Sequence, residues 1–114
     1  ITPANASNIN DGAASILLAS KEAVEKYNLQ PLAKIIAYAD ASQEPEWFTT
    51  SPAIAIQKAL KQANLSINQI DYFEINEAYA AVILANQSIL GIPSHKINIY
   101  GGAVAMGHPL GASG

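Results

Sequence analysis

Segments with the period of a helix and segments with the period of a strand alternate along this chain. Apolar residues recur three or four positions apart in the helical segments, whereas the strand segments alternate or are apolar throughout. Helices are expected over residues 13–27, 51–63 and 77–90 and from Pro109 onward, and strands over residues 34–38, 71–75 and 96–100. Because helix and strand follow one another repeatedly, the order predicts a layered α/β fold.

Two of the turns between these segments carry clear start signals. Ser51 suits the N-cap of a helix and Pro52 its first position. Ser66 and Gln69 have the spacing of a capping box, which predicts a short helical turn. The helix expected over residues 77–90 carries almost no charge, and this predicts that it is buried on most sides.

The composition indicates that part of the surface of this chain packs against other protein. Half of the residues are hydrophobic and only 13% are charged, whereas soluble domains carry about 25% charged residues. The sequence starts at Ile1 without a methionine and ends inside an expected helix. We therefore expect an interior piece of a larger protein or a subunit of an oligomer.

Charge and cysteine content argue against several classes of partner. The net charge is −3 and the six Lys and Arg residues form no run, so neither nucleic acid nor an anionic membrane is an expected partner. No apolar stretch approaches the roughly 20 residues that span a bilayer. There is no cysteine, and two histidines do not make a zinc site, so no disulfide or side-chain metal site is expected.

The last part of the sequence is rich in glycine and holds one imidazole. Five glycines fall among the fourteen residues from Gly101 to Gly114, which lets the backbone approach another group closely. The segment lacks the Lys-Ser/Thr pair of a P-loop and the spacing of a dinucleotide-binding motif. His108 lies at an expected helix N-terminus, where positive potential favours the neutral ring, a base or hydrogen-bond donor. A histidine of a tight turn is the alternative interpretation.

Asn76 and Glu77 lie where the strand expected over residues 71–75 meets the following helix. In open α/β sheets, ligand sites lie at the carboxyl ends of strands, which makes Asn76 a candidate site residue. The alternative is that Asn76 caps the helix and Glu77 interacts with the helix dipole.

Three segments, in family order and at family spacing, resemble motifs of the thiolases. They are Asn5 to Ala14, Asn76 to Tyr79 and Gly101 to Gly114. The loop over residues 39–52 and Tyr100 are most similar to the acetoacetyl-CoA thiolases of fungi and other eukaryotes. The resemblance implies a thiolase-like layered α/β/α fold. Residues 1–31 would end the N-terminal domain, and residues 32–114 would form the first part of the C-terminal domain.

The resemblance implies an acetyl-CoA C-acetyltransferase, an acyltransferase that condenses two acetyl-CoA to acetoacetyl-CoA or catalyses the reverse thiolysis. The reaction runs through a cysteine acyl-enzyme, and both family cysteines would lie outside this chain, so the isolated chain is expected to be inactive. His108 matches the residue that activates the nucleophilic cysteine and donates to a thioester oxygen. Asn76 matches the residue that holds a water in the same oxyanion hole.

The resemblance also implies substrate-binding positions. Ser7 matches a residue whose hydroxyl contacts the pantetheine arm of CoA. Phe48 and Tyr79 match bulky residues that line this arm and the acyl pocket, and Tyr79 stands where most relatives carry Phe.

No cofactor is required in the family, because the CoA thioester is the substrate. Some relatives bind a monovalent cation, K⁺, through main-chain carbonyls at positions that match Ala4, Ala6 and Val104. The expected partners are acetyl-CoA, acetoacetyl-CoA, CoA and further copies of the chain in a tetramer or dimer. The expected compartment is the cytoplasm, in sterol-precursor synthesis by the mevalonate pathway, with the mitochondrion as the alternative.

Three other functions are the alternatives. One is a 3-ketoacyl-CoA thiolase of fatty-acid β-oxidation, and another is a 3-ketoacyl synthase of the same superfamily. The synthases lack the pairing of Gly-His-Pro with Asn-Glu-Ala-aromatic that this sequence contains. The third is a non-catalytic binding module that has kept the thiolase fold.

Overall fold

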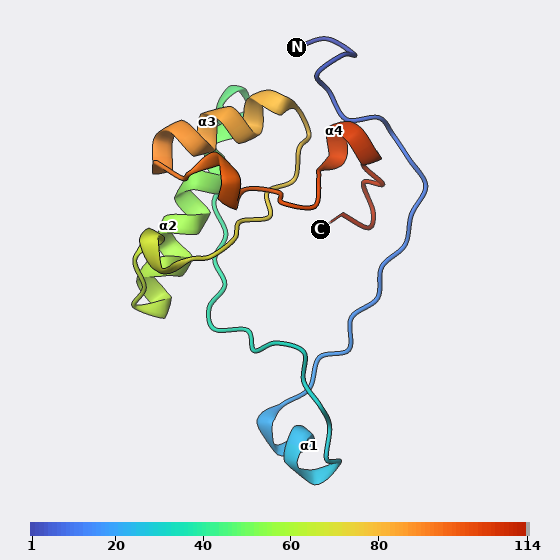
Figure 1. The fold of residues 1–114 in the computed structure, drawn as a ribbon, viewed down its shortest axis with the longest axis vertical. Helices are drawn as coiled ribbons and strands as arrows, with labels where there is room; N and C mark the ends of the chain where they lie inside the picture. The colour runs from blue at the N-terminus through green and yellow to red at the C-terminus, as the bar shows by residue number, and fades with distance from the viewer. Residues whose placement is uncertain (114) are drawn as a thin grey trace.

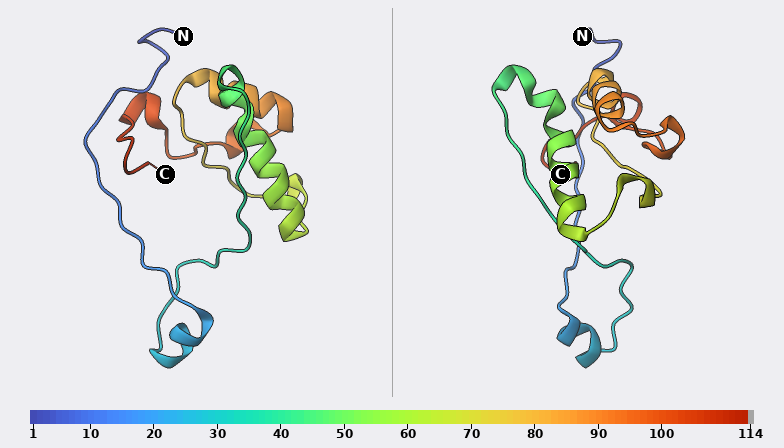
Figure 2. Two further views of the ribbon diagram at one scale, coloured as in Figure 1. Left: turned by 180° about the vertical axis from the view of Figure 1, so that it is seen from behind. Right: turned by 90° about the vertical axis from the view of Figure 1, so that its left-hand side faces the viewer.

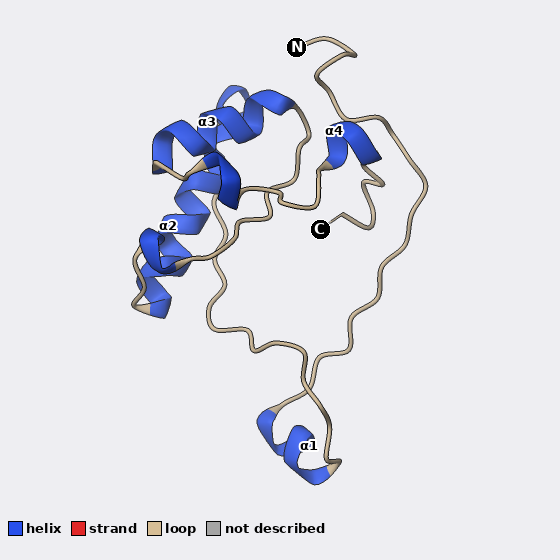
Figure 3. Cartoon of the chain, in the orientation of Figure 1, coloured by secondary structure: helices blue, strands red, loops and turns tan. Residues whose placement is uncertain are grey.

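The computed structural model describes residues 1–113, which form α-helices, short 3-10 helices and irregular segments (Figures 1 and 3). The helices are α1 (Lys21–Lys26), α2 (Ser51–Ala63), α3 (Ala80–Leu90) and α4 (Ala103–Met106), and the 3-10 helices are η1 (Pro45–Thr50), η2 (Ile67–Gln69) and η3 (Ser94–Lys96). None of the helices in this part of the chain is long and apolar enough to cross a membrane. Helix α1 stands apart from the other helices, at the end of two long extended segments (Figure 2).

Helix α2 confirms the expectation for residues 51–63. It continues directly from η1, so Ser51 is its first residue and the cap position belongs to Thr50. The prediction that Ser51 is the N-cap is therefore wrong, and its hydroxyl instead accepts a hydrogen bond from Gln43 Nε2 at 3.2 Å. The capping box between Ser66 and Gln69 is confirmed.

Helix α3 is shorter and less buried than the sequence predicts. It begins at Ala80 rather than at Glu77. Only Val82 and Asn86 of this helix are buried. The exposed members include Leu84 and Ile89. Asn86 is fully buried and its amide donates to the Thr49 carbonyl at 2.8 Å, which ties α3 to the end of η1.

The helix expected over residues 13–27 forms only over Lys21–Lys26. Ser20 caps it by accepting a hydrogen bond from Ala23 N at 3.2 Å. Ile16 and Leu17 are 83% and 87% exposed, so their apolar face has no partner among residues 1–113. Because packing of that face supplies most of the stability of such a helix, the segment before Ser20 stays extended.

The expected strands do not form regular ladders within the described residues. Residues 34–38 are irregular. Residues 71–75 pair with residues 96–100 through a single parallel bridge between Phe73 and Ile97. The bridge ends at once because Asn98, with φ of 47°, turns the backbone away. A strand needs a neighbouring strand along several residues to satisfy its amides and carbonyls. Here each of these segments has at most one isolated bridge to another segment.

The core lies between these extended segments and α3. Its buried members are Phe73, Ile75, Val82, Ile92 and Ile97, and half-buried apolar side chains from α2, η2 and α3 pack around them. Ile75 is the last of the core residues before Asn76. The core therefore fixes the backbone from which the Asn76 side chain projects.

Candidate active site

Asn76 and His108 lie against each other although 32 residues separate them in sequence. Asn76 Nδ2 is 3.3 Å from His108 Nε2. Asn76 directly follows the core residue Ile75, and His108 follows α4. Helix α3 begins after Tyr79 without a side-chain cap, so the alternative that Asn76 caps this helix is wrong. The structure thus brings together the two residues predicted to be catalytic.

The other ring nitrogen of His108 contacts Ser113. Nδ1 lies 2.8 Å from Ser113 Oγ, and the Ser113 hydroxyl donates to the Pro109 carbonyl at 3.3 Å. With the imidazole proton on Nδ1, the ring donates to Ser113 and Nε2 accepts from the Asn76 amide, so this tautomer satisfies all three contacts together. Nε2 is then the acceptor that faces Asn76, which is the form a general base needs. No sequence feature predicts this contact for Ser113.

The backbone around His108 is held by the N-terminal segment. His108 N donates to the Asn8 carbonyl at 2.7 Å, and Ile9 pairs with His108 in a parallel bridge. Asn10 Nδ2 donates to the Met106 carbonyl at 2.9 Å. Gly107 has φ of +93°, and a Cβ on it would overlap the Asn10 amide. Asn10 and Gly107 therefore fit together to set the turn that presents His108, a role not predicted from the sequence.

The glycine-rich segment is not only a turn. Residues 103–106 form α4, and the residues after Pro109 form a turn in which the amides of Ala112 and Ser113 donate to the Pro109 carbonyl. The helix expected from Pro109 is therefore not formed over residues 109–113, and its last residue, Gly114, lies outside the described residues.

Ser7 lies beside the backbone that follows Asn76. Its hydroxyl donates to the Ala78 carbonyl at 3.2 Å, and its amide donates to the same oxygen at 3.1 Å. An antiparallel bridge between Ala6 and Tyr79 continues this contact. Because the hydroxyl is a donor here, its oxygen keeps lone pairs that can accept from a ligand amide.

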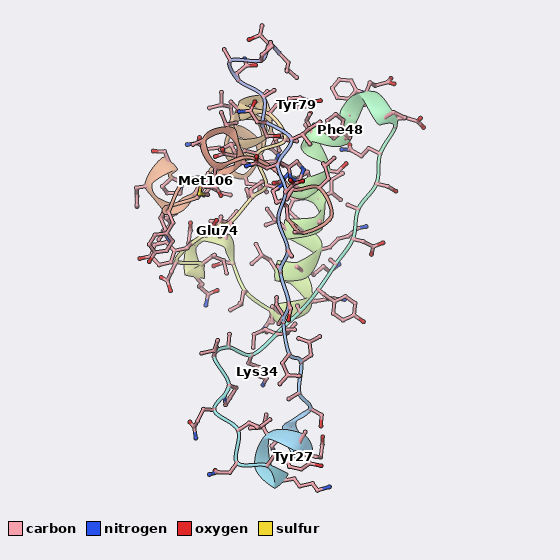
Figure 4. The ribbon with its side chains drawn as sticks, turned by 90° about the vertical axis from the view of Figure 1, so that its right-hand side faces the viewer. Tyr27, Lys34, Phe48, Glu74, Tyr79 and Met106 are labelled. Atoms are coloured by element: carbon pink, nitrogen blue, oxygen red, sulfur yellow. The ribbon has the colours of Figure 1, made fainter. Side chains whose placement is uncertain are left out.

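Phe48 and Tyr79 form an aromatic pair. Their ring centres are 6.1 Å apart and the planes meet at 69°, which is an edge-to-face contact (Figure 4). Phe48 comes from η1 and is 49% exposed, whereas Tyr79 directly precedes α3 and is half-buried. The two predicted pocket residues thus lie together, on the side of α3 where η1 packs.

The carbonyls expected to hold a monovalent cation have free lone pairs. Among the hydrogen bonds within residues 1–113, none ends on the carbonyl oxygen of Ala4, Ala6 or Val104. This suits cation binding, because a coordinating carbonyl needs an unused lone pair. No cluster of His, Asp and Glu that could hold a metal ion occurs in this part of the chain.

The comparison with protein families matches residues 29–114 to the description "Thiolase, C-terminal domain". The chain belongs to the thiolase family. An acetyl-CoA acetyltransferase of Gibberella zeae, named as cytosolic, is 54% identical over the whole chain and is covered over 29% of its own length. This thiolase segment therefore spans less than a third of that relative.

Solved thiolase structures share its fold. A thiolase from Ascaris suum, crystallised in complex with coenzyme A, is 50% identical with a TM-score of 0.98, covering 100% of this chain and 30% of its own. The human mitochondrial 3-ketoacyl-CoA thiolase is 43% identical with a TM-score of 0.96, covering 99% and 29%. The prediction of a thiolase-like α/β fold is confirmed, while the division between residues 31 and 32 stays a prediction.

Proposed function

We propose that the protein containing this thiolase segment is an acetyl-CoA C-acetyltransferase. It would condense two acetyl-CoA to acetoacetyl-CoA, or cleave acetoacetyl-CoA with CoA. The contact between Asn76 and His108 is the observation that most supports this, because a neutral amide and an imidazole converge at one point. The 54% identity to the Gibberella enzyme of that name supports the substrate class.

His108 acts first as a base in this proposal. With its proton on Nδ1, the ring can take the thiol proton of a cysteine at Nε2. The thiolate then attacks the acetyl carbon of acetyl-CoA and the C–S bond to CoA breaks. CoA leaves as its thiolate, so an acetyl-enzyme and a His108 ring protonated at Nε2 remain. The chain contains no cysteine, so the nucleophile comes from outside these 114 residues.

Asn76 and His108 then act together on the second acetyl-CoA. The second cysteine of the family, which would also lie outside these residues, takes a proton from the methyl group of this acetyl-CoA, and negative charge develops on the thioester oxygen. Nε2–H of His108 and a water held by Asn76 donate to that oxygen, and fixed donors of this kind are each worth about 3 kcal/mol in a water-excluded site. The methyl carbon then attacks the acetyl-enzyme, and the first cysteine leaves as its thiolate. Asparagine suits the position because its amide donates and accepts without titrating.

The remaining predicted residues bind the substrate. The Ser7 oxygen accepts from an amide of the pantetheine arm, and the Phe48–Tyr79 pair lines the arm and the acyl pocket. The free carbonyls of Ala4, Ala6 and Val104 would hold K⁺, whose positive charge would offset the carbonyl dipoles of the N-terminal segment and of α4. We also propose a cytoplasmic homotetramer or dimer in sterol-precursor synthesis, and the Gibberella name supports that compartment.

A substrate comparison tests the proposal. The purified full-length protein is assayed for thiolysis of acetoacetyl-CoA and of a long-chain 3-ketoacyl-CoA, and the 114 residues by themselves serve as a cysteine-free control. We expect kcat/KM to favour acetoacetyl-CoA and the control to be inactive. A preference for the long chain would instead support the β-oxidation thiolase. Binding of CoA without turnover of either substrate would support the non-catalytic module.

A further inference from the structure

We propose that Glu77 is a positioning residue that sets Asn76 against His108, an inference that rests on the proposed thiolase function. Glu77 follows Asn76 directly and is half-buried. Its carboxylate accepts from Asn98 Nδ2 at 2.9 Å through Oε1 and from Val104 N at 3.1 Å through Oε2. One side chain therefore joins the Asn76 segment to the turn at Asn98 and to α4, the helix that leads to His108.

Asn98 completes the connection on the side of Asn76. Its Nδ2 donates both to Glu77 and, at 2.9 Å, to the Ile75 carbonyl, and its Oδ1 accepts from Ile75 N at 2.8 Å. The side-chain amide thus bonds Ile75 as a neighbouring strand would. Residues on both sides of Asn76 are held by this one amide, so rotation of the Asn76 backbone is restricted.

Gly102 provides the space for the Glu77 carboxylate. A Cβ on Gly102 would overlap the carboxyl carbon and both carboxylate oxygens of Glu77. Its φ of −150° and ψ of −177° are extended angles that any residue adopts, so the glycine serves packing rather than backbone conformation. The carboxylate therefore sits directly on the backbone at the start of α4.

Glu77 positions Asn76 and α4 and takes no direct part in the reaction. Glu77 contacts neither ring nitrogen of His108, whose partners are Asn76 and Ser113. The backbone of His108 is held independently by Asn8, so loss of Glu77 should move Asn76 and α4 relative to a fixed imidazole. A displacement of about 1 Å in a catalytic group can cost on the order of 100-fold in rate.

Kinetics of variants in the full-length enzyme test this positioning role. Glu77→Ala should lower kcat by about 10- to 100-fold and leave KM within about twofold. Glu77→Gln keeps one acceptor and should fall between Ala and the native residue. Glu74→Ala removes an exposed carboxylate from the same segment and is the matched control. Unchanged kcat per folded molecule with a lower Tm would mean that Glu77 only stabilises the fold.

A double-variant cycle tests the contact with Gly102. Gly102→Ala should lower kcat by a similar factor in the native enzyme, because the new methyl group displaces the carboxylate. In the Glu77→Ala background the same substitution should cost less than about twofold, since the overlapping group is gone. An equal penalty in both backgrounds would overturn the proposed arrangement.

A measurement that needs no turnover separates this inference from the proposed function. In ¹⁵N-histidine-labelled full-length protein, Glu77→Ala should shift the His108 ring signals in the same direction as Asn76→Ala. The signals of His95 should stay in place, and Glu74→Ala should move neither histidine. His108 signals that stay unchanged in Glu77→Ala would overturn the positioning role. Absence of thiolase activity in the native protein would instead overturn only the proposed function.

Discussion

The side-chain amide of Asn76 lies 3.3 Å from Nε2 of His108. The two residues reach this distance through different elements, because Asn76 projects from the core segment and His108 from the turn after α4. Ser113 binds the opposite nitrogen, so the imidazole is oriented at both ends. A ring held in this way offers one nitrogen for proton transfer.

Replacing His108 with alanine should lower the turnover of the full-length enzyme at least about 100-fold, because a base and an oxyanion donor are lost together. Folding should change little, since the ring is only half-buried in a turn. His95→Ala is the matched control, because the chain has only one other histidine and it is exposed. Acetoacetyl-CoA thiolysis measures the effect, and near-native turnover would show that His108 is only a turn residue.

Asn76→Asp should reduce turnover more than Asn76→Ala. The carboxylate places a fixed negative charge where the negative charge of the enolate oxygen must develop, and the two like charges repel each other. Alanine leaves space for a water that can still donate. The comparison is made by kcat for both variants in the same assay. Equal activity of the Asp variant and the native enzyme would exclude the electrostatic role.

Elements that depend on local signals could be predicted from the sequence. Helix α2 forms where it is expected, with its first residue at Ser51 rather than at Pro52, and the capping box of Ser66 and Gln69 is present. Elements that depend on packing against other segments could not be predicted from the sequence. The apolar residues over residues 13–19 and 34–38 have helical or strand periodicity, but all of them except the half-buried Ala37 are exposed.

In the candidate site, too, only some features could be predicted from the sequence. Asn76 and His108 could be identified because the segments that contain them resemble thiolase motifs, whereas each residue alone also allowed a purely structural interpretation. The contacts that hold them could not be predicted from the sequence. They depend on the positive φ of Asn98 and on the space that the missing side chains of Gly102 and Gly107 leave for neighbouring side chains. Sequence spacing does not report which glycine provides space and which provides a positive φ.

Gly107→Ala should destabilise the protein more than Gly91→Ala. Both glycines have positive φ, +93° and +67°. Gly91, with ψ of 29°, lies in the left-handed helical region, where another residue incurs strain of about 1–2 kcal/mol. Gly107, with ψ of 164°, lies in a region that is essentially restricted to glycine. Only at Gly107 would the new Cβ also overlap a side chain, the Asn10 amide, whereas nothing lies within 4 Å at Gly91. Urea unfolding of the full-length variants measures the difference. Equal losses would mean that Asn10 moves away without cost.

Ser7→Ala in the full-length enzyme should raise the apparent KM for CoA substrates more than it lowers kcat. The proposed contact with the pantetheine arm lies away from the reacting carbon, so it is present in the ground state and in the transition state alike. One neutral hydrogen bond is worth about 0.5–1.5 kcal/mol, which corresponds to a few-fold to about tenfold in KM.

The same hydroxyl also donates to the Ala78 carbonyl at 3.2 Å, so its removal should lower Tm modestly as well. The Ser7 amide keeps its own bond to that oxygen at 3.1 Å, and the carbonyl is therefore not left unpaired in the variant. Steady-state kinetics and thermal unfolding together separate the two contributions. A lower Tm with an unchanged KM would remove Ser7 from the substrate site, whereas the assignments of Asn76 and His108 would stand, because they rest on a contact that Ser7 does not make.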